Sequence, residues 1–230
     1  MSLRLNTQSP NFEAETTQGW INFHEWIGDA WVIFFSHPKD FTPVCTTELA
    51  SLAGLLPQFA ARNTKVIGLS ADPVSCHSEW AKDIEAARGY PVTYPLIADP
   101  DLVVAELYDM LPDTAGDDPV EAPDERETLV IRSVFIIGPD KRIKASLSYP
   151  FNTGRNFDEI IRLLDSCQVT AKYRVATPAN WHHGEEVIVL PGASPNAQEV
   201  SGGRETSLPY VRLAPDPSFG TEWFESLPRR

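Results

Sequence analysis

The stretch AWVIFFSHPKDFTPVCTTELASLAGLLPQFAA, residues 30–61, joins an apolar run to a segment with helical periodicity. The run 30–36 predicts a buried β-strand. Apolar residues then recur at helical spacing and predict one apolar helix face: Leu49, Leu52, Ala53, Leu56, Phe59 and Ala60. The rest of the fold follows from this strand–loop–helix unit.

The junction of this unit carries the signals of a helix start. Thr42 is a favourable N-cap residue and Pro43 suits the first helical position, which puts Cys45 at the third. A sulfur there lies near unpaired backbone N–H groups and the positive end of the helix dipole, which favours thiolate over thiol. The sequence therefore predicts a reactive nucleophile, and the alternative is a small buried side chain without chemistry.

The remaining pattern alternates strands with helices. Further strands are expected near 20–23 and over 65–71, 94–98, 129–137 and 143–149, the last two forming a hairpin around 138–141. Further helices are expected from Asp72-Pro73 to Gly89, after Asp99 or Asp101 with Leu102, Val103, Leu107 and Tyr108 inward, and over 156–167. This order indicates an α/β fold, a mixed sheet flanked by helices.

The composition changes after about Thr170, where Pro, Gly and Ser become frequent. Only EEVIVLP and LPYVRLAP read as short strands in this region. We therefore expect two domains, 1–168 and a small C-terminal domain over 169–230. The acidic, Pro-rich segment 111–128 is expected to be a solvated surface loop.

The formal net charge of −13 and the absence of a basic stripe disfavour nucleic acid and anionic membranes as partners. The chain has no run of 18 apolar residues, so no membrane span is expected. Its N-terminal residues lack the pattern of a signal peptide, and its three cysteines include no C-x-x-C. These features favour a cytoplasmic location.

Pro38, Thr42 and Cys45 stand at the spacing P-x-x-x-T-x-x-C, within the string SHPKDFTPVCTTEL. This string resembles the active-site motif of peroxiredoxins, and most closely that of the one-cysteine (sixth) subfamily of the AhpC/TSA thioredoxin-like superfamily. Three more strings resemble the same subfamily: TLVIRSVFIIGPDKRIK around Arg132, Tyr149-Pro150 followed by TGRNFDEI, and RVATP followed by Trp181. The resemblance covers about residues 1–190.

The resemblance implies a thioredoxin-like fold and a homodimer in which the C-terminal domain packs on the partner subunit. It implies a thiol-dependent peroxidase that reduces hydrogen peroxide and alkyl hydroperoxides through a sulfenic acid at Cys45, without a cofactor. The expected reductant is an external thiol of the glutathione or thioredoxin type. An alternative is a peroxide sensor or chaperone-like protein whose assembly responds to oxidation of Cys45.

Arg132 is the leading candidate for a partner of Cys45. It lies inside the apolar run LVIRSVFII, and a buried guanidinium needs an anionic partner. Its charge and forked donors would stabilise both the thiolate and the charge that develops on the peroxide. The alternative is a surface ion pair.

The resemblance also implies roles for the neighbouring residues. Thr42 would orient the peroxide as well as cap the helix, and Pro38 would shield the site from water. His37 is expected to act in access or reduction, and Glu48 to order the active-site network. Arg155, in the TGRN string, is a weaker supporting candidate.

The two other cysteines bear on how the sulfenic acid is reduced. Cys167 is expected to fill the core, while Cys76, at a helix start beside His77, is a candidate secondary thiol. The chain has no cysteine after Cys167, so the Val-Cys-Pro motif of two-cysteine relatives is missing. A thioredoxin-like disulfide reductase is disfavoured because Glu48 stands where the second cysteine of C-x-x-C would be.

One further pattern is expected to carry no metal. His182 and His183 with Glu185 and Glu186 lack the ligand spacing of a tetrahedral site and are expected to form a solvated loop.

Some one-cysteine relatives also carry phospholipase A2 activity on a GDSWG string, but residues 28–32 read GDAWV here. His24 and Asp140 match the other members of that triad, yet Ala30 has no hydroxyl for acyl transfer. We therefore expect no phospholipase activity. Pure protein incubated with phosphatidylcholine should release no fatty acid, and release that Asp140→Ala abolishes would contradict this.

Overall fold

The structure is a computed structural model, which describes residues 3–112, 130–191, 200 and 203–219. The chain divides into two compact units, residues 1–155 and 156–230. The predicted domain boundary lies after residue 168, at the end of an expected helix, and it stays a prediction. The expected loop 111–128 lies almost wholly outside the described residues.

The first unit is built on a seven-stranded mixed sheet. Its strands are β1 (Glu13–Thr16), β2 (Gly19–Asn22), β3 (Trp31–Ser36), β4 (Thr64–Ser70), β5 (Leu96–Ala98), β6 (Arg132–Ile137) and β7 (Ile143–Tyr149). They are arranged in the order β2-β1-β5-β4-β3-β6-β7. The pairs β3/β4 and β4/β5 are parallel, and the other pairs are antiparallel. The predicted mixed α/β fold is therefore confirmed.

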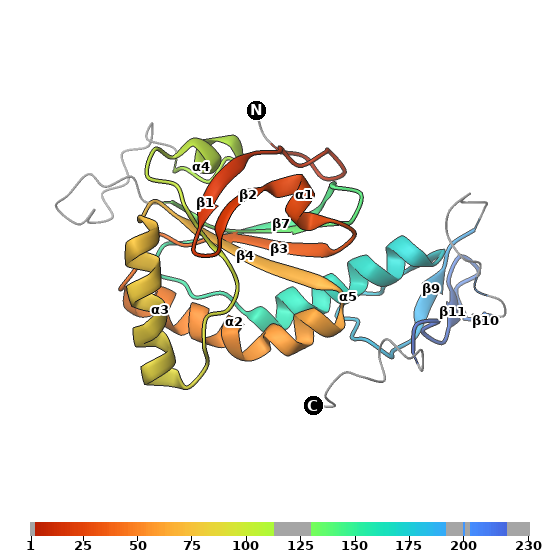
Figure 1. Cartoon of the computed structure of the whole chain (residues 1–230). Coiled ribbons are helices and arrows are strands. Elements are labelled where there is room, and N and C mark those ends of the chain that lie inside the picture. Colours follow the sequence, from red (N-terminus) through yellow and green to blue (C-terminus); the bar gives the residue numbers. More distant parts are fainter. Residues whose placement is uncertain (1–2, 113–129, 192–199, 201–202, 220–230) are drawn as a thin grey trace. The chain divides into compact units, whose positions relative to one another are not determined.

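Helices cover both faces of this sheet. Figure 1 shows α2 (Pro43–Ala61) and α3 (Val74–Arg88) on one face, and α1 (Phe23–Ile27) and α4 (Val103–Leu107) on the other. Alternate residues of β3 and β4 join the aromatic core under α1 and α4, which includes Phe12, Phe23, Phe34, Ile67, Leu69 and Tyr108. Because both faces are covered, all six residues of β3 are buried.

The other face of the sheet is tightly packed at Gly68. A Cβ atom added there would lie 2.7 Å from Leu96 Cδ2 and 2.8 Å from Phe35 Cζ. Only glycine leaves room for the Phe35 ring at this point, and that ring supports a charged side chain of the candidate site.

The structure corrects two expectations in this unit. In α4, Val103 is 63% exposed and Leu107 40% exposed, so these two predicted inward positions were wrong, whereas Leu102 packs against the core and Tyr108 is buried as expected. Leu102 adopts a left-handed conformation before the helix, and the Asp99 carboxylate accepts hydrogen bonds from the N–H groups of Val104 and Ala105, which sets this different phase. Strand β1 and helix α1 were not predicted, since the short polar strand EAET shows no long apolar run.

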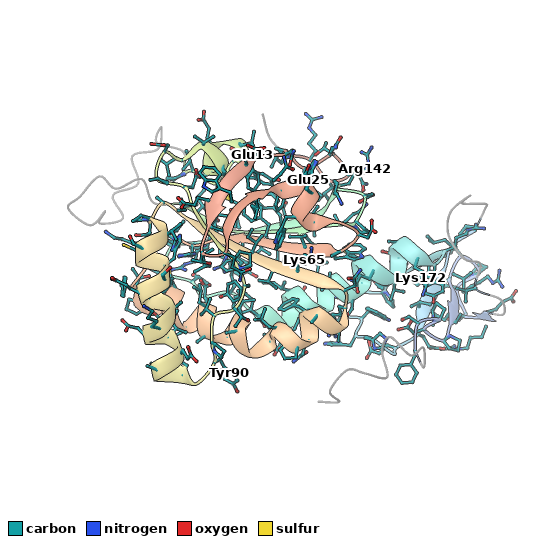
Figure 2. The ribbon with its side chains drawn as sticks, in the orientation of Figure 1. Glu13, Glu25, Lys65, Tyr90, Arg142 and Lys172 are labelled. Carbon is teal, nitrogen blue, oxygen red and sulfur yellow. The ribbon has the colours of Figure 1, made fainter. Side chains whose placement is uncertain are left out.

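Polar side chains of both signs lie on the outside of this unit. Glu13, Glu25 and Arg142 are exposed and labelled in Figure 2. Within the described residues, no helix is both long and apolar enough to cross a bilayer.

The second unit combines one helix with a small sheet. It holds α5 (Phe157–Lys172), β8 (Val175–Ala176), β9 (Val187–Val189), β10 (Arg204–Glu205) and β11 (Arg212–Ala214), with the sheet order β10-β11-β9-β8. Strands β9 and β11 confirm the two predicted strands, and α5 ends at Lys172 rather than at Cys167. A small core forms around Trp181, Tyr173 and Val187.

Candidate active site

Cys45 lies where the sequence predicted it. Helix α2 begins at Pro43 after Thr42 in extended N-cap conformation, so Cys45 is the third helical residue, and it is fully buried. The Thr42 side chain makes no capping hydrogen bond, however. Its hydroxyl instead donates to the Lys39 carbonyl oxygen at 2.9 Å, so the capping position was right and the capping bond was wrong.

The loop that enters α2 is strained at Phe41. This residue has φ of 54°, a left-handed conformation that is unusual for a bulky side chain, and its ring is 52% exposed. Such strain concentrates at functional sites, where the surrounding structure holds it in place. The residue directly before Thr42 therefore adopts a conformation that its own side chain disfavours.

Arg132 reaches Cys45 from the first position of β6, next to β3 in the sheet. Its side chain is buried, and one terminal guanidinium nitrogen lies 3.2 Å from Cys45 Sγ and donates to Glu48 Oε2 at 2.8 Å. Nε donates to the Phe151 carbonyl oxygen at 2.8 Å, and the guanidinium lies 5.8 Å from the centre of the Phe151 ring. Three fixed contacts thus aim this charge at the sulfur.

Glu48 connects Arg132 to a second buried arginine. It lies on α2 three residues after Cys45, and its Oε1 accepts hydrogen bonds from Arg155 N and Nε at 2.8 and 2.9 Å. Its Oε2 accepts from Arg155 at 2.6 Å as well as from Arg132. One carboxylate therefore holds two guanidinium groups, which leaves the buried site with an excess of one positive charge.

Arg155 ties this network to the sheet. One terminal nitrogen donates to the carbonyl oxygens of Ser36 and Ser133, at the ends of β3 and β6. The guanidinium lies 5.0 Å from the centre of the Phe35 ring, the ring that Gly68 accommodates. The sequence named Arg155 only as a weak candidate, yet the structure places it at the centre of the network.

Pro38 and His37 are both buried in the loop between β3 and α2. The His37 ring meets Asp40, with Nε2 at 2.8 Å from Oδ1, rather than Cys45. Burial lowers the pKa of His37 and outweighs the opposing effect of its hydrogen bond with Asp40. His37 is therefore a neutral imidazole at neutral pH.

Asp40 and His77 are not among the site residues that the sequence predicts. The two lie 37 residues apart in the chain, yet His77 Nδ1 is 2.6 Å from Asp40 Oδ2. The only sequence signal was the place of Asp40 inside the motif and of His77 near the start of a helix.

The two other cysteines lie in different surroundings from Cys45. Cys76 is half-buried, and its pKa is raised by burial and then by the negative charges of Asp72, Asp40 and Glu79, which is the opposite of an activated thiol. Cys167 is also half-buried, so it is not the fully buried core residue that the sequence analysis expected.

The residues of the phospholipase-like pattern and of the His182–Glu186 pattern make ordinary polar contacts. His24 Nε2 contacts the Ser9 carbonyl oxygen at 2.9 Å, and Asp140 pairs with Lys144 at 2.6 Å. In the second unit, His182 lies 4.0 Å from Glu185, and His183 lies 3.6 Å from Asp216.

Known proteins share this fold and these sequence features. The AhpC/TSA family matches residues 5–146, and the C-terminal domain of 1-Cys peroxiredoxin matches residues 166–202. A 1-Cys peroxiredoxin of Dictyostelium discoideum is 45% identical over 94% of this chain and 86% of its own length.

Two solved structures agree closely with this one. Peroxiredoxin 6 of Arenicola marina, in a cysteine-to-serine variant, has a TM-score of 0.80 and 41% identity over 94% of this chain and 99% of its own. A yeast mitochondrial 1-Cys peroxiredoxin, solved to explain thiol resolution by glutathione and thioredoxin systems, has the same TM-score and identity over 93% and 99%. This chain therefore belongs to the AhpC/TSA family of thiol-dependent peroxidases, in its one-cysteine peroxiredoxin branch.

Proposed function

We propose that Cys45 is the peroxide-reactive thiol of this peroxidase. The observation that carries the proposal is the buried Arg132 guanidinium 3.2 Å from Sγ. The Cys45 thiolate attacks one peroxide oxygen, the S–O bond forms and the O–O bond breaks. The other oxygen leaves as alkoxide or hydroxide and takes a proton, giving alcohol or water, and Cys45 becomes a sulfenic acid.

Arg132 acts on the charge in this step. Its forked donors stabilise the attacking thiolate and the negative charge that develops on the leaving oxygen, in a site from which water is excluded. Glu48 fixes the direction of this guanidinium, and Arg155 fixes Glu48 from the other side. These two are supporting residues, because they act through Arg132.

Thr42, Pro38 and His37 line the approach to the sulfur in this proposal. Thr42 lies three residues before Cys45, and its hydroxyl can turn from the Lys39 carbonyl oxygen to a bound peroxide. Pro38 is buried and contributes no backbone N–H, so it helps to keep water out. His37 is a neutral group available for a hydrogen bond during reduction.

The cycle uses an external thiol. That thiol attacks the sulfenic acid, forms a mixed disulfide with Cys45 and releases water. A second thiol then attacks the sulfur of the first, which frees the Cys45 thiolate and releases the two external thiols as a disulfide. The raised pKa of Cys76 disfavours it as an internal resolving thiol. The yeast relative, described with glutathione and thioredoxin systems, supports a reductant of that type.

The proposal also covers the oligomeric state, the cellular location and phospholipase A2 activity. A homodimer is supported by the seven-residue strand β7, which lies at an edge of the sheet; residues 6 and 7 bond to Ile143 at its start, and no described strand pairs with the rest of its outer side. A cytoplasmic location is supported by three cysteines that form no disulfide with one another. No phospholipase activity is proposed, because Ala30 offers no nucleophile.

Arg132→Met should lower the second-order rate constant for hydrogen peroxide by about 10²- to 10³-fold, the usual loss when a key electrostatic donor is removed. Arg132→Lys keeps the positive charge but lacks the forked guanidinium donors, so its rate constant should lie between those of the wild type and Arg132→Met. Stopped-flow measurement of Cys45 oxidation checks this. An unchanged rate in Arg132→Met would remove Arg132 from the mechanism.

Cys45→Ser should abolish peroxide turnover, because the hydroxyl is a far weaker nucleophile than a thiolate. Cys76→Ser and Cys167→Ser are matched controls and should retain turnover with a small thiol. In wild-type protein, brief sub-stoichiometric peroxide with a sulfenic-acid trap should label Cys45 alone on peptide mapping. A disulfide from Cys45 to either cysteine would replace the one-cysteine cycle, and slow stoichiometric oxidation coupled to a change in assembly would favour the sensor alternative.

Sedimentation equilibrium should give twice the mass of one chain. Lysine at the exposed positions Ser146 and Ser148 of β7 should shift the mass towards the monomer, because charged lysines block edge pairing. Glu13→Lys on β1 is the control for added positive charge. A monomeric wild-type protein would contradict the homodimer.

A further inference from the structure

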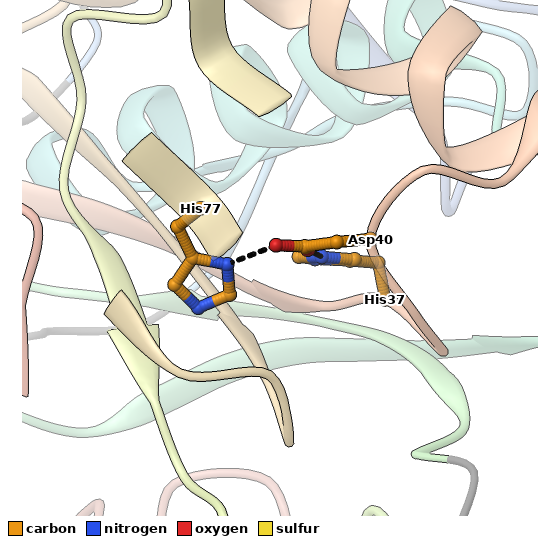
Figure 3. A group of neighbouring side chains, drawn as sticks. All are labelled: His37, Asp40 and His77. Atoms are coloured by element: carbon orange, nitrogen blue, oxygen red, sulfur yellow. Dashed lines mark hydrogen bonds and ion pairs between the residues drawn. The ribbon is translucent and has the colours of Figure 1, made fainter. Parts of the chain in front are cut away.

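Three buried polar side chains form one group beside the reactive helix, and only one of them, His37, has a task in the proposed chemistry. Figure 3 shows His37, Asp40 and His77 in one group. Asp40 lies between the two imidazoles, with Oδ1 at 2.8 Å from His37 Nε2 and Oδ2 at 2.6 Å from His77 Nδ1. All three side chains are almost fully buried, so each proton in the group has a defined place.

The protons on His77 follow from its two neighbours. Its Nε2 lies 3.1 Å from the Ile97 carbonyl oxygen, which can only accept, so this nitrogen carries a proton. Its Nδ1 faces the Asp40 carboxylate. Burial alone would raise the pKa of Asp40, but the hydrogen bonds from His37 and His77 hold it below its usual value. Asp40 is thus an ionised acceptor, and His77 Nδ1 donates to it.

The proton on His37 follows in the same way. Burial lowers the pKa of His37, so its ring is neutral and carries one N–H. Asp40 accepts that hydrogen bond at Nε2, which leaves Nδ1 with a bare lone pair. Nδ1 is a buried atom without a hydrogen-bond partner among the described residues. A buried acceptor of this kind points to a donor that arrives with a ligand.

The same three groups could suggest a metal site, since their ligand atoms lie within 4.8 Å of one another. Two imidazoles and a carboxylate do suit transition metals. However, a divalent cation would displace protons that now complete short hydrogen bonds. It would also add positive charge near Arg155, whose charge already disfavours protonation of His37. The hydrogen-bonded arrangement explains the group better.

The His37 ring lies close to the reactive helix. Its centre is 5.3 Å from that of the Trp80 ring, and Trp80 Nε1 donates to the hydroxyl of Thr46, the residue after Cys45. The backbone between His37 and Asp40 is fixed as well, because Asp40 N donates to the Asp72 carboxylate. The bare nitrogen therefore belongs to a ring that is held in place and that packs against Trp80, the side chain bonded to the residue after Cys45.

We propose that His77 is a positioning residue that acts through Asp40: it holds His37 as the Nε2–H tautomer, so that Nδ1 accepts a hydrogen bond from a reactant at Cys45. The donor is an O–H or S–H group, supplied by the hydroperoxide or by the reductant thiol. This inference rests on the proposed reaction at Cys45. It assigns functions to Asp40 and His77, which that reaction leaves unexplained.

The first test reads the tautomer directly. In wild-type protein labelled with ¹⁵N-histidine, the reduced enzyme should show His37 with a bare Nδ1 and a protonated Nε2. His77→Leu should abolish this single state, because the charge of Asp40 is then shared with His37 alone and favours a second proton on it. His77→Asn keeps a hydrogen-bond donor to Asp40, so this variant should show the single wild-type tautomer of His37. A wild-type His37 protonated at Nδ1 would overturn the proposal, whether or not any variant folds.

The second test separates the two sources of the donor. Stopped-flow rate constants are measured for oxidation of Cys45 by hydrogen peroxide and for reduction of its sulfenic acid by glutathione. His77→Leu should lower at least one of them by about three- to tenfold, the loss of one hydrogen bond, and His77→Asn should recover it. A fall in oxidation identifies the hydroperoxide as donor, and a fall in reduction identifies the thiol.

The outcomes distinguish this inference from the proposed function. An altered His37 tautomer with both rate constants unchanged would contradict the inference and leave Cys45 as the reactive thiol. Wild-type protein in which Cys45 does not react with peroxide would instead contradict the proposed function, and with it the predicted effects on the two rate constants.

Discussion

The site depends on the hydrogen-bonded ion pairs that the Glu48 carboxylate makes with Arg132 and Arg155. This carboxylate accepts hydrogen bonds from two buried arginines, and one of these arginines touches the sulfur of Cys45. Removing one partner of a buried ion pair typically costs about 3–5 kcal/mol, because the other charge is left uncompensated. Loss of Glu48 would leave two guanidinium groups with the Cys45 thiolate as their one anionic partner in this network. The helix, the sheet and the loop after β7 are thus held together at one residue.

Much of this arrangement could be predicted from local sequence. The apolar run 30–36 became β3, and the Thr42-Pro43 pair marked the start of α2 and so the position of Cys45. Arg132 was recognisable because an isolated charge inside an apolar strand needs a buried partner. These predictions succeeded because each depends on residues within one or two turns of structure.

The rest depends on contacts between distant segments. Glu48 and Arg155 are 107 residues apart, and Asp40 and His77 are 37 apart, so no local pattern pairs them. Arg132 is also held by the carbonyl oxygen of Phe151, a backbone group that any residue would offer. Val103 and Leu107 were wrongly predicted to face inward, because Leu102 and Asp99 set where α4 begins, which periodicity alone does not reveal.

The excess positive charge of the site ties the fold to its chemistry. With Cys45 as a thiolate, two guanidiniums meet two anions and the buried charges cancel. When the sulfur becomes a neutral sulfenic acid, Glu48 alone faces both arginines and one buried charge loses its counterion. Each turnover therefore loosens and then restores the electrostatic balance at the junction of β3, β6 and α2. The thermal stability of the first unit should therefore depend on the oxidation state of the Cys45 sulfur.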